Sequence, residues 1–180
     1  MRRSRLFAVT AAAVGIAGFT AAAGAGDQKR DFETDLLGYE EVPAVSTTGG
    51  GQMNAEISRD GTEIRYVLRY RNLESAVRQA HIHFGAARTN GGISVWLCDS
   101  AENPSPLATT QACDPSPATM TGTLTAADVV GPSGQGIAAG EFAELVRAMR
   151  AGVTYANVHT ADRGGGEIRG QFDQRGHQDD

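Results

Sequence analysis

Three of the four histidines fall in two short segments that resemble β-strands. His81 and His83 lie two residues apart in segment 79–85, and His159 lies in segment 155–160. Side chains two residues apart on a strand leave the same face, so His81 and His83 are expected to share one. Neutral imidazole is the commonest metal ligand. The sequence therefore predicts a site for copper or zinc, with an affinity that falls below a pH of about 6.5 as histidine is protonated.

A structural interpretation of the same histidines stays open. Imidazoles near Tyr155 and Asn157 can hydrogen-bond to neighbouring strands and hold loops onto a sheet without any ligand. Both interpretations place these two side chains beside the histidine cluster. His177 lies in a charged tail and is left out of it.

Two charged residues are candidates for tuning the site. Glu41 is a candidate to orient an imidazole, although the Val-Pro pair that follows it fits a structural turn equally well. Arg169 either attracts an anion to the histidines or forms an ion pair with Glu167 or Glu41, and we favour the ion pair.

Other catalytic patterns do not stand out. The sequence shows no Ser-His-Asp order, phosphate-binding loop or paired-carboxylate motif, so hydrolase chemistry has no support. We therefore expect a binding module more than an enzyme, and no catalytic residue is assigned. Trp96, the only tryptophan, lies in an apolar strand-like segment and is expected in the core.

The first 25 residues have the features of a secretory signal peptide. Arg2, Arg3 and Arg5 precede an apolar run from Leu6 to Thr20, and small residues follow. A membrane-spanning helix needs roughly 20 apolar residues, and the apolar run 6–20 is shorter than that. We therefore expect no membrane span in the protein after the signal peptide is cleaved. This organisation predicts export to the periplasm or the extracellular space.

Charge excludes one class of partner. Removing residues 1–25 takes away three arginines and no acidic residue, which changes the net charge from −5 to −8. Nucleic-acid binding draws its affinity from Lys and Arg, so an acidic chain argues against it. An envelope or extracellular protein is the expected kind of macromolecular partner.

Cys98 and Cys113 are the only cysteines. In an oxidising compartment they are expected to form one disulfide. A thiolate metal site is the less favoured alternative, because the spacing is far from C-x-x-C.

Strand-like segments alternate with turns along the chain, and Asp60-Gly61 is a strong hairpin signal. The segments are 32–37, 53–57, 63–70, 79–85, 93–97, 120–124, 154–159 and 167–172. One helix is expected over 141–151, because apolar residues recur there at i, i+3, i+4 and i+7.

These elements predict an antiparallel β-sandwich of about seven to nine strands, like immunoglobulins and superoxide dismutases, with one short helix. One domain over 32–172 is expected, between a flexible segment at 26–31 and a flexible tail at 173–180.

Several motifs resemble the CHRD domain, the module repeated in chordin and found singly in many exported bacterial proteins. They occur in order at Leu37-Gly38-Tyr39-Glu40-Glu41-Val42-Pro43, 80–85, 90–92, 97–98, 122–124, 155–160 and 166–171. The resemblance covers 32–172. Ala44 replaces a frequent second proline, and chordin's cysteine-rich repeats are absent, so growth-factor binding is not carried over.

The His-x-His pair is also similar to the one that begins the metal site of copper–zinc superoxide dismutases. This chain lacks the further histidines of their bridged zinc site. Three hypotheses follow: an exported CHRD module that binds copper, zinc or a partner through a histidine face, a superoxide-dismutase-like metalloenzyme, or a structural envelope or matrix module.

Overall fold

The computed structural model describes residues 28–172, so the expected signal peptide, the tail and His177 lie outside the described residues. Eight strands pair antiparallel in one sheet of order β5-β4-β7-β8-β1-β2-β3-β6. They are β1 (Asp31–Leu37), β2 (Gly50–Ile57), β3 (Ile64–Arg71), β4 (Val77–Phe84), β5 (Gly92–Cys98), β6 (Ala118–Leu124), β7 (Thr154–Thr160) and β8 (Ile168–Gln171).

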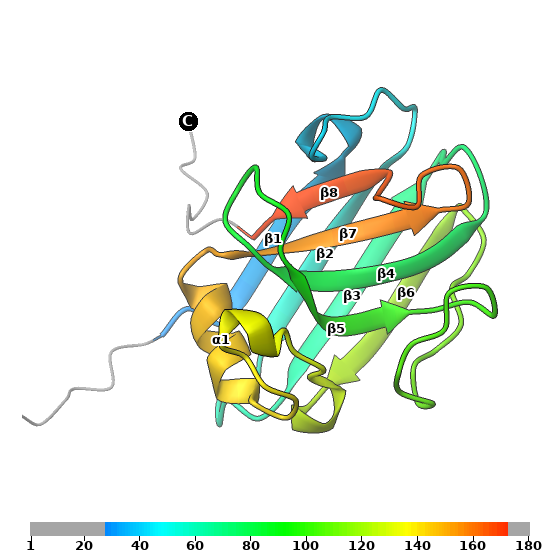
Figure 1. Cartoon of the computed structure of the whole chain (residues 1–180). Coiled ribbons are helices and arrows are strands. Elements are labelled where there is room, and N and C mark those ends of the chain that lie inside the picture. The colour runs from blue at the N-terminus through cyan, green and yellow to red at the C-terminus, as the bar shows by residue number, and fades with distance from the viewer. Residues whose placement is uncertain (1–27, 173–180) are drawn as a thin grey trace, which may run out of the picture.

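The sheet folds back on itself. β5, β4, β7 and β8 cross in front of β1, β2, β3 and β6 (Figure 1), and β8 joins β1 at the pair Leu37–Arg169. The Tyr66 hydroxyl on β3 donates to the Leu97 carbonyl on β5 at 3.0 Å, across the two halves. The expected mainly β, antiparallel fold with one helix is confirmed. The strands form a single nearly closed, barrel-like sheet, so the finer prediction of a two-sheet sandwich is not confirmed.

Strand alternation separates the core from the outer face. Every second side chain of β3, from Ile64 to Tyr70, is buried, as the two-residue period of a strand predicts. Ile82 on β4 and Val158 on β7 are fully buried in the same core. The side chains next to Ile82 and Val158 along each strand point the other way. The outer face of the sheet therefore carries His81, His83 and His159.

The helix α1 (Phe142–Arg150) packs its apolar stripe against one end of the sheet (Figure 1), which confirms the predicted helix. Gly152 follows it with a positive φ of 70°, a conformation that suits glycine at a helix end. Arg150 Nε donates to the Lys29 carbonyl at 3.1 Å, and the Arg30 carbonyl accepts from Ile57 N at 2.8 Å. The last residues of the segment expected to be flexible are therefore bound to the domain.

Three short 3-10 helices lie in two of the connections, one between β1 and β2 and two between β6 and α1. They are η1 (Gly38–Glu40), η2 (Ala126–Asp128) and η3 (Ser133–Gln135). η1 begins the connection from β1 to β2, which lies close to β8 in Figure 1.

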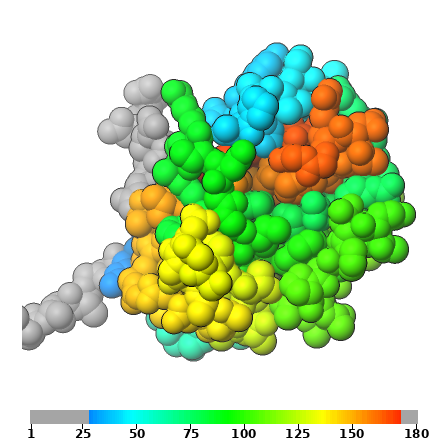
Figure 2. Space-filling view, in the orientation of Figure 1, coloured from blue at the N-terminus to red at the C-terminus, as the bar shows by residue number. Residues whose placement is uncertain are grey.

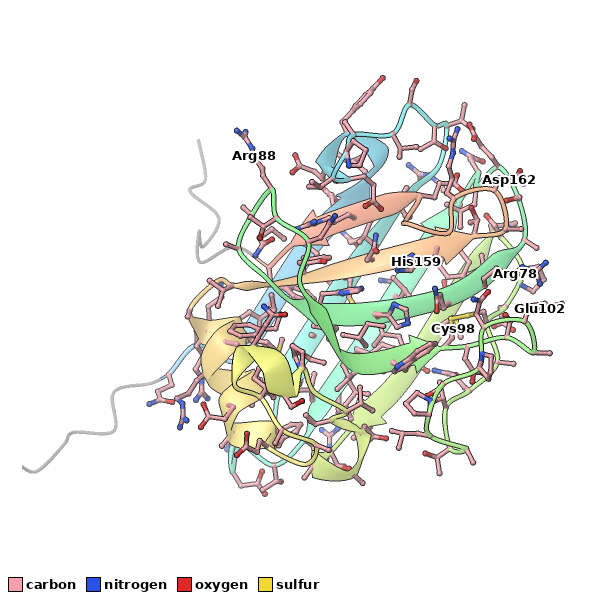
Figure 3. The ribbon with its side chains drawn as sticks, in the orientation of Figure 1. Arg78, Arg88, Cys98, Glu102, His159 and Asp162 are labelled. Atoms are coloured by element: carbon pink, nitrogen blue, oxygen red, sulfur yellow. A yellow bond between two sulfur atoms is a disulfide. The ribbon has the colours of Figure 1, made fainter. Side chains whose placement is uncertain are left out.

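The predicted disulfide is present between Cys98 and Cys113. It closes a loop of residues 99–112 against the sheet, where Gln111 Nε2 donates to the Tyr66 hydroxyl at 2.6 Å. The same loop forms an ion pair from Glu102 to Arg78 on β4, seen at its edge in Figure 3.

We expect no free thiol in the unfolded, unreduced protein. Reduction is expected to lower the free energy of unfolding by about 3 kcal/mol, because the open loop gains conformational entropy in the unfolded chain. Thiol titration in denaturant and urea unfolding with and without reductant measure both effects. Two thiols per chain before reduction would contradict the disulfide.

Candidate metal centre

Cross-strand register brings the histidines together on the outer face of β4 and β7. His83 lies opposite Tyr155, and Gln79 lies opposite His159. His81 sits between these two rows on β4, so its ring meets that of His159 diagonally. The shared strand face predicted for His81 and His83 thus extends to His159 on the neighbouring strand.

The three imidazoles form a compact cluster. His81 Nδ1 lies 3.2 Å from His159 Nε2, and each ring offers a nitrogen within 4.8 Å of the other two. His81 is fully buried, and His83 and His159 are each 7% exposed. Figure 3 shows His159 at the middle of the outer face. Residues 38–49, 85–91 and 161–167, visible in cyan, green and orange in Figure 2, surround this region.

Two backbone carbonyls fix the orientation of two rings. His83 Nδ1 lies 3.0 Å from the Gly91 carbonyl, and His159 Nδ1 lies 3.0 Å from the Gly164 carbonyl. A carbonyl only accepts hydrogen bonds, so both Nδ1 atoms carry the proton and both Nε2 atoms keep a lone pair. Metal-bound histidines are typically held in this way.

The remaining nitrogens are not all satisfied. Since His159 Nε2 has no proton, His81 Nδ1–H donates to it, and His81 Nε2 is left as an acceptor. Neither His81 Nε2 nor His83 Nε2 has a hydrogen-bond partner among the described residues. An unsatisfied buried polar atom costs about 1–3 kcal/mol. The cluster therefore holds buried lone pairs that a cation would satisfy.

Burial keeps the three rings neutral. It lowers the pKa of His81 to about 2, with a further decrease from the neighbouring imidazoles. Burial also lowers the pKa of His83 and of His159 to about 4, although their carbonyl partners act in the opposite direction. Protons should therefore compete with a metal on the folded protein near pH 4, and not near the pH of about 6.5 expected from free histidine.

Two aromatic rings enclose the cluster. Tyr155 stacks on His83 with centroids 4.7 Å apart, and Trp96 meets His81 edge to face at 4.2 Å. The prediction that Trp96 belongs to the core is wrong, because its indole is half-buried on the outer face. Its neighbours Val95 and Leu97 fill the inner face, so strand alternation places Trp96 beside the histidines.

Arg169 is buried beside the cluster, with 2% of it exposed. Its guanidinium carbon lies 3.4 Å from the centroid of the Tyr155 ring. It donates to the Thr89 carbonyl at 2.8 Å and, at longer range, to the Ala86 carbonyl and Asn90 Oδ1. These partners are neutral oxygens of one loop, in place of the expected carboxylates.

Glu41 contacts Asn157 and does not orient an imidazole by a direct hydrogen bond. Asn157 Nδ2 donates to Glu41 Oε1 at 2.5 Å and to the Ile168 carbonyl at 3.1 Å. Burial raises the pKa of Glu41 to about 7, while the Asn157 bond and the charge of Arg169 act to lower it. Glu41 and Arg169 thus interact electrostatically next to the histidines.

Glu167, the other carboxylate expected to pair with Arg169, has a different role. It is fully buried and accepts from the hydroxyls of Thr47 and Thr160 and from Glu74 N. It therefore ties together three connections at the end of the sheet.

The residues that sequence reasoning missed are Gly91, Gly164 and Trp96. Both glycines act through their carbonyls, and a backbone carbonyl leaves no side-chain signature. Tight turns are indicated by the sequences Asn90-Gly91-Gly92 and Gly164-Gly165-Gly166. These sequences do not indicate which histidine on a neighbouring strand each turn will contact.

Comparison with known proteins assigns this chain to a family but identifies no individual relative. Neither the curated proteins nor the solved structures give a match. Among residues 28–172, no helix is long and apolar enough to cross a membrane. The CHRD domain model matches residues 32–172, which is most of the chain. This protein therefore belongs to the CHRD domain family.

Proposed function

We propose that this protein is an exported CHRD module that binds one transition-metal ion, copper or zinc, through His81, His83 and His159. The observation that carries the proposal is the tautomeric state of the cluster. Carbonyls hold the Nδ1 protons of two rings, while buried Nε2 lone pairs on His81 and His83 have no donor. His83 is thus ready to accept a metal through Nε2, and at His159 the metal would take the place of the hydrogen bond from His81 Nδ1.

A purely structural cluster would use its nitrogens differently. Buried polar atoms in folded proteins nearly always have hydrogen-bond partners, because the unsatisfied atom costs free energy. Here one hydrogen bond joins two of the rings, and two ring nitrogens are left over. A metal ion bound by the three rings would use nitrogen lone pairs that are now unpaired or engaged only within the cluster.

Burial also favours binding over catalysis. A catalytic metal keeps an open position for water or substrate. The three rings are 0–7% exposed, and Trp96 and Tyr155 lie against them. Export is supported by the signal-like residues 1–25 and is compatible with the disulfide.

Calorimetric titration with Cu(II) and Zn(II) tests the proposal. We expect one site in the wild type and in the tail control His177→Ala. His81→Ala, His83→Ala and His159→Ala should each weaken it by on the order of hundredfold or more, because each removes a ligand. Binding that survives these changes, or that disappears with His177 alone, would overturn the proposal.

Trp96 offers an optical readout of the same site. It is the only tryptophan, and its ring contacts His81. One equivalent of Cu(II), a paramagnetic quencher, is therefore expected to remove most of the tryptophan fluorescence, and Zn(II) much less. The matched controls are His83→Ala, which should prevent quenching, and His177→Ala, which should not. Equal quenching in both variants would place the copper elsewhere.

The two rival hypotheses are separated by further measurements. A superoxide-dismutase-like enzyme would turn over superoxide well above free metal when loaded. A structural envelope or matrix module would bind no metal at the cluster, and replacing its histidines would change only stability.

A further inference from the structure

We propose that the three-histidine site selects Cu(I) over Cu(II) and Zn(II), and that the buried Arg169 cation contributes to this selectivity. The inference rests on the proposed metal binding and names the ion and its oxidation state. Two independent features lead to this inference. One is the number and the neutral charge of the ligands, and the other is the positive charge of Arg169 close to His83.

The ligand set suits a low coordination number. Within residues 28–172, the only cluster of this kind contains three histidines and no carboxylate or thiolate. Cu(II) prefers a tetragonal set of ligands, and Zn(II) almost always takes four. The rings are only 0–7% exposed, so water from the solvent has little access as a fourth ligand. Cu(I) has a filled d shell and is stable with three ligands.

The charge of the site favours the same ion. A histidine binds a metal as neutral imidazole, and all three rings are buried, so the full charge of the ion would remain in a buried environment. The cost of burying an ion increases steeply with its charge when no opposite charge compensates it. A monovalent cation is therefore accommodated more easily than a divalent one.

Arg169 adds a fixed positive charge behind His83. β7 lies between β4 and β8, so His83 and Arg169 contact opposite faces of the Tyr155 ring. The guanidinium carbon lies 3.4 Å from the Tyr155 centroid and the His83 centroid 4.7 Å from it, so only the Tyr155 ring separates the charge of Arg169 from His83. The field of this charge must oppose each additional positive charge at His83 Nε2.

Compensation of this charge is incomplete. The hydrogen-bond partners of Arg169 are the neutral oxygens of Thr89, Ala86 and Asn90. Glu41 and Glu40 are the acids whose charges act on Arg169. Glu41 is itself buried, with a pKa of about 7, so it is only partly ionised at neutral pH.

Competition titrations of the full chain in a His177→Ala background test the selectivity. Cu(I) is measured without oxygen against bicinchoninate, and Cu(II) and Zn(II) against chelators of known affinity. We expect a dissociation constant for Cu(I) at least about a hundredfold below those for the divalent ions. For copper this corresponds to a reduction potential about 120 mV above that of the free couple, at 59 mV per tenfold.

Charge variants test the role of Arg169. Arg169→Gln is expected to reduce the ratio of Cu(I) to Cu(II) affinity about tenfold, lowering the potential by about 59 mV, whereas Arg169→Lys keeps the charge and most of the effect. Glu41→Gln retains an oxygen for Asn157 and should shift the potential the opposite way at pH 8.5, where the wild-type acid is ionised. If Arg169→Gln does not fold, the Glu41→Gln variant alone tests whether charge near the site sets the potential.

The outcomes separate the two proposals. Divalent binding at the three histidines as tight as that of Cu(I) would overturn the selectivity and leave the metal site standing. Absence of any metal site would overturn both. A potential that neither charge variant shifts would contradict the contribution of Arg169.

Discussion

His83→Phe is expected to abolish stabilisation by metal while leaving the metal-free protein at least as stable as the wild type. A ligand at a thousandfold excess over its dissociation constant stabilises the folded state by about 4 kcal/mol, and the variant should lose this gain. Phenylalanine keeps the stack on Tyr155 and removes the unpaired Nε2. That removal offsets the lost bond to the Gly91 carbonyl, since an unsatisfied atom costs about 1–3 kcal/mol and a hydrogen bond contributes about 1.

Urea unfolding at pH 7.5, with and without one metal at a time, measures both effects. His177→Ala is the matched control and should keep the full gain. The structural interpretation predicts the reverse pattern: no metal effect in the wild type, and a metal-free variant destabilised by its lost hydrogen bond. That pattern would rule out the metal centre.

The metal-free protein is expected to lose stability steeply in acid. The three clustered histidines have pKa values of about 2 to 4 when folded and about 6.5 when unfolded. Between pH 4 and 6.5 the unfolded chain therefore binds more protons, so the free energy of unfolding falls as pH falls. Each histidine contributes about 1.4 kcal/mol per pH unit in this range.

Glu41 acts in the opposite direction. Its pKa is about 7 when folded, against 4.5 for the ordinary side chain, so between these values the folded protein binds the extra proton. Three histidines against one acid leave a net difference of two protons, or about 2.7 kcal/mol per pH unit from pH 6.5 to 4.5. Folded domains typically have a free energy of unfolding of about 5–15 kcal/mol. The loss over these two pH units is therefore comparable to the whole stability of a typical domain.

Urea unfolding of the metal-free protein at several pH values between 4.5 and 7 measures the slope. His83→Phe should make it shallower by about 1.4 kcal/mol per pH unit, and Glu41→Gln should make it steeper by a similar amount. A stability that is flat across this range would contradict neutral, buried imidazoles.

Much of the fold follows from local patterns in the sequence. The alternation in residues 63–70 predicted β3, and the i, i+3, i+4 and i+7 pattern predicted α1. The spacing of His81 and His83 predicted a shared face for the same reason. Each inference needs only the period of one element, which the side chains of that element display.

The rest depends on which segments meet. Nothing in residues 155–160 says that β7 pairs with β4, and this pairing decides that His159 joins the cluster. Charge alone predicts acidic partners for Arg169, but the loop after β4 folds over its guanidinium and presents carbonyls. Trp96 was different, because alternation with Val95 and Leu97 could have placed it outside the core.

Nitrogen-15 NMR of the histidine side chains tests the central claim most directly. In the metal-free protein, His83 and His159 should show protonated Nδ1 and bare Nε2. One equivalent of Zn(II) or Cu(I), both diamagnetic, should shift Nε2 of these two rings and one nitrogen of His81, while both Nδ1 protons stay in place. Unchanged signals from the three rings, or shifts confined to His177, would contradict a metal centre at this cluster.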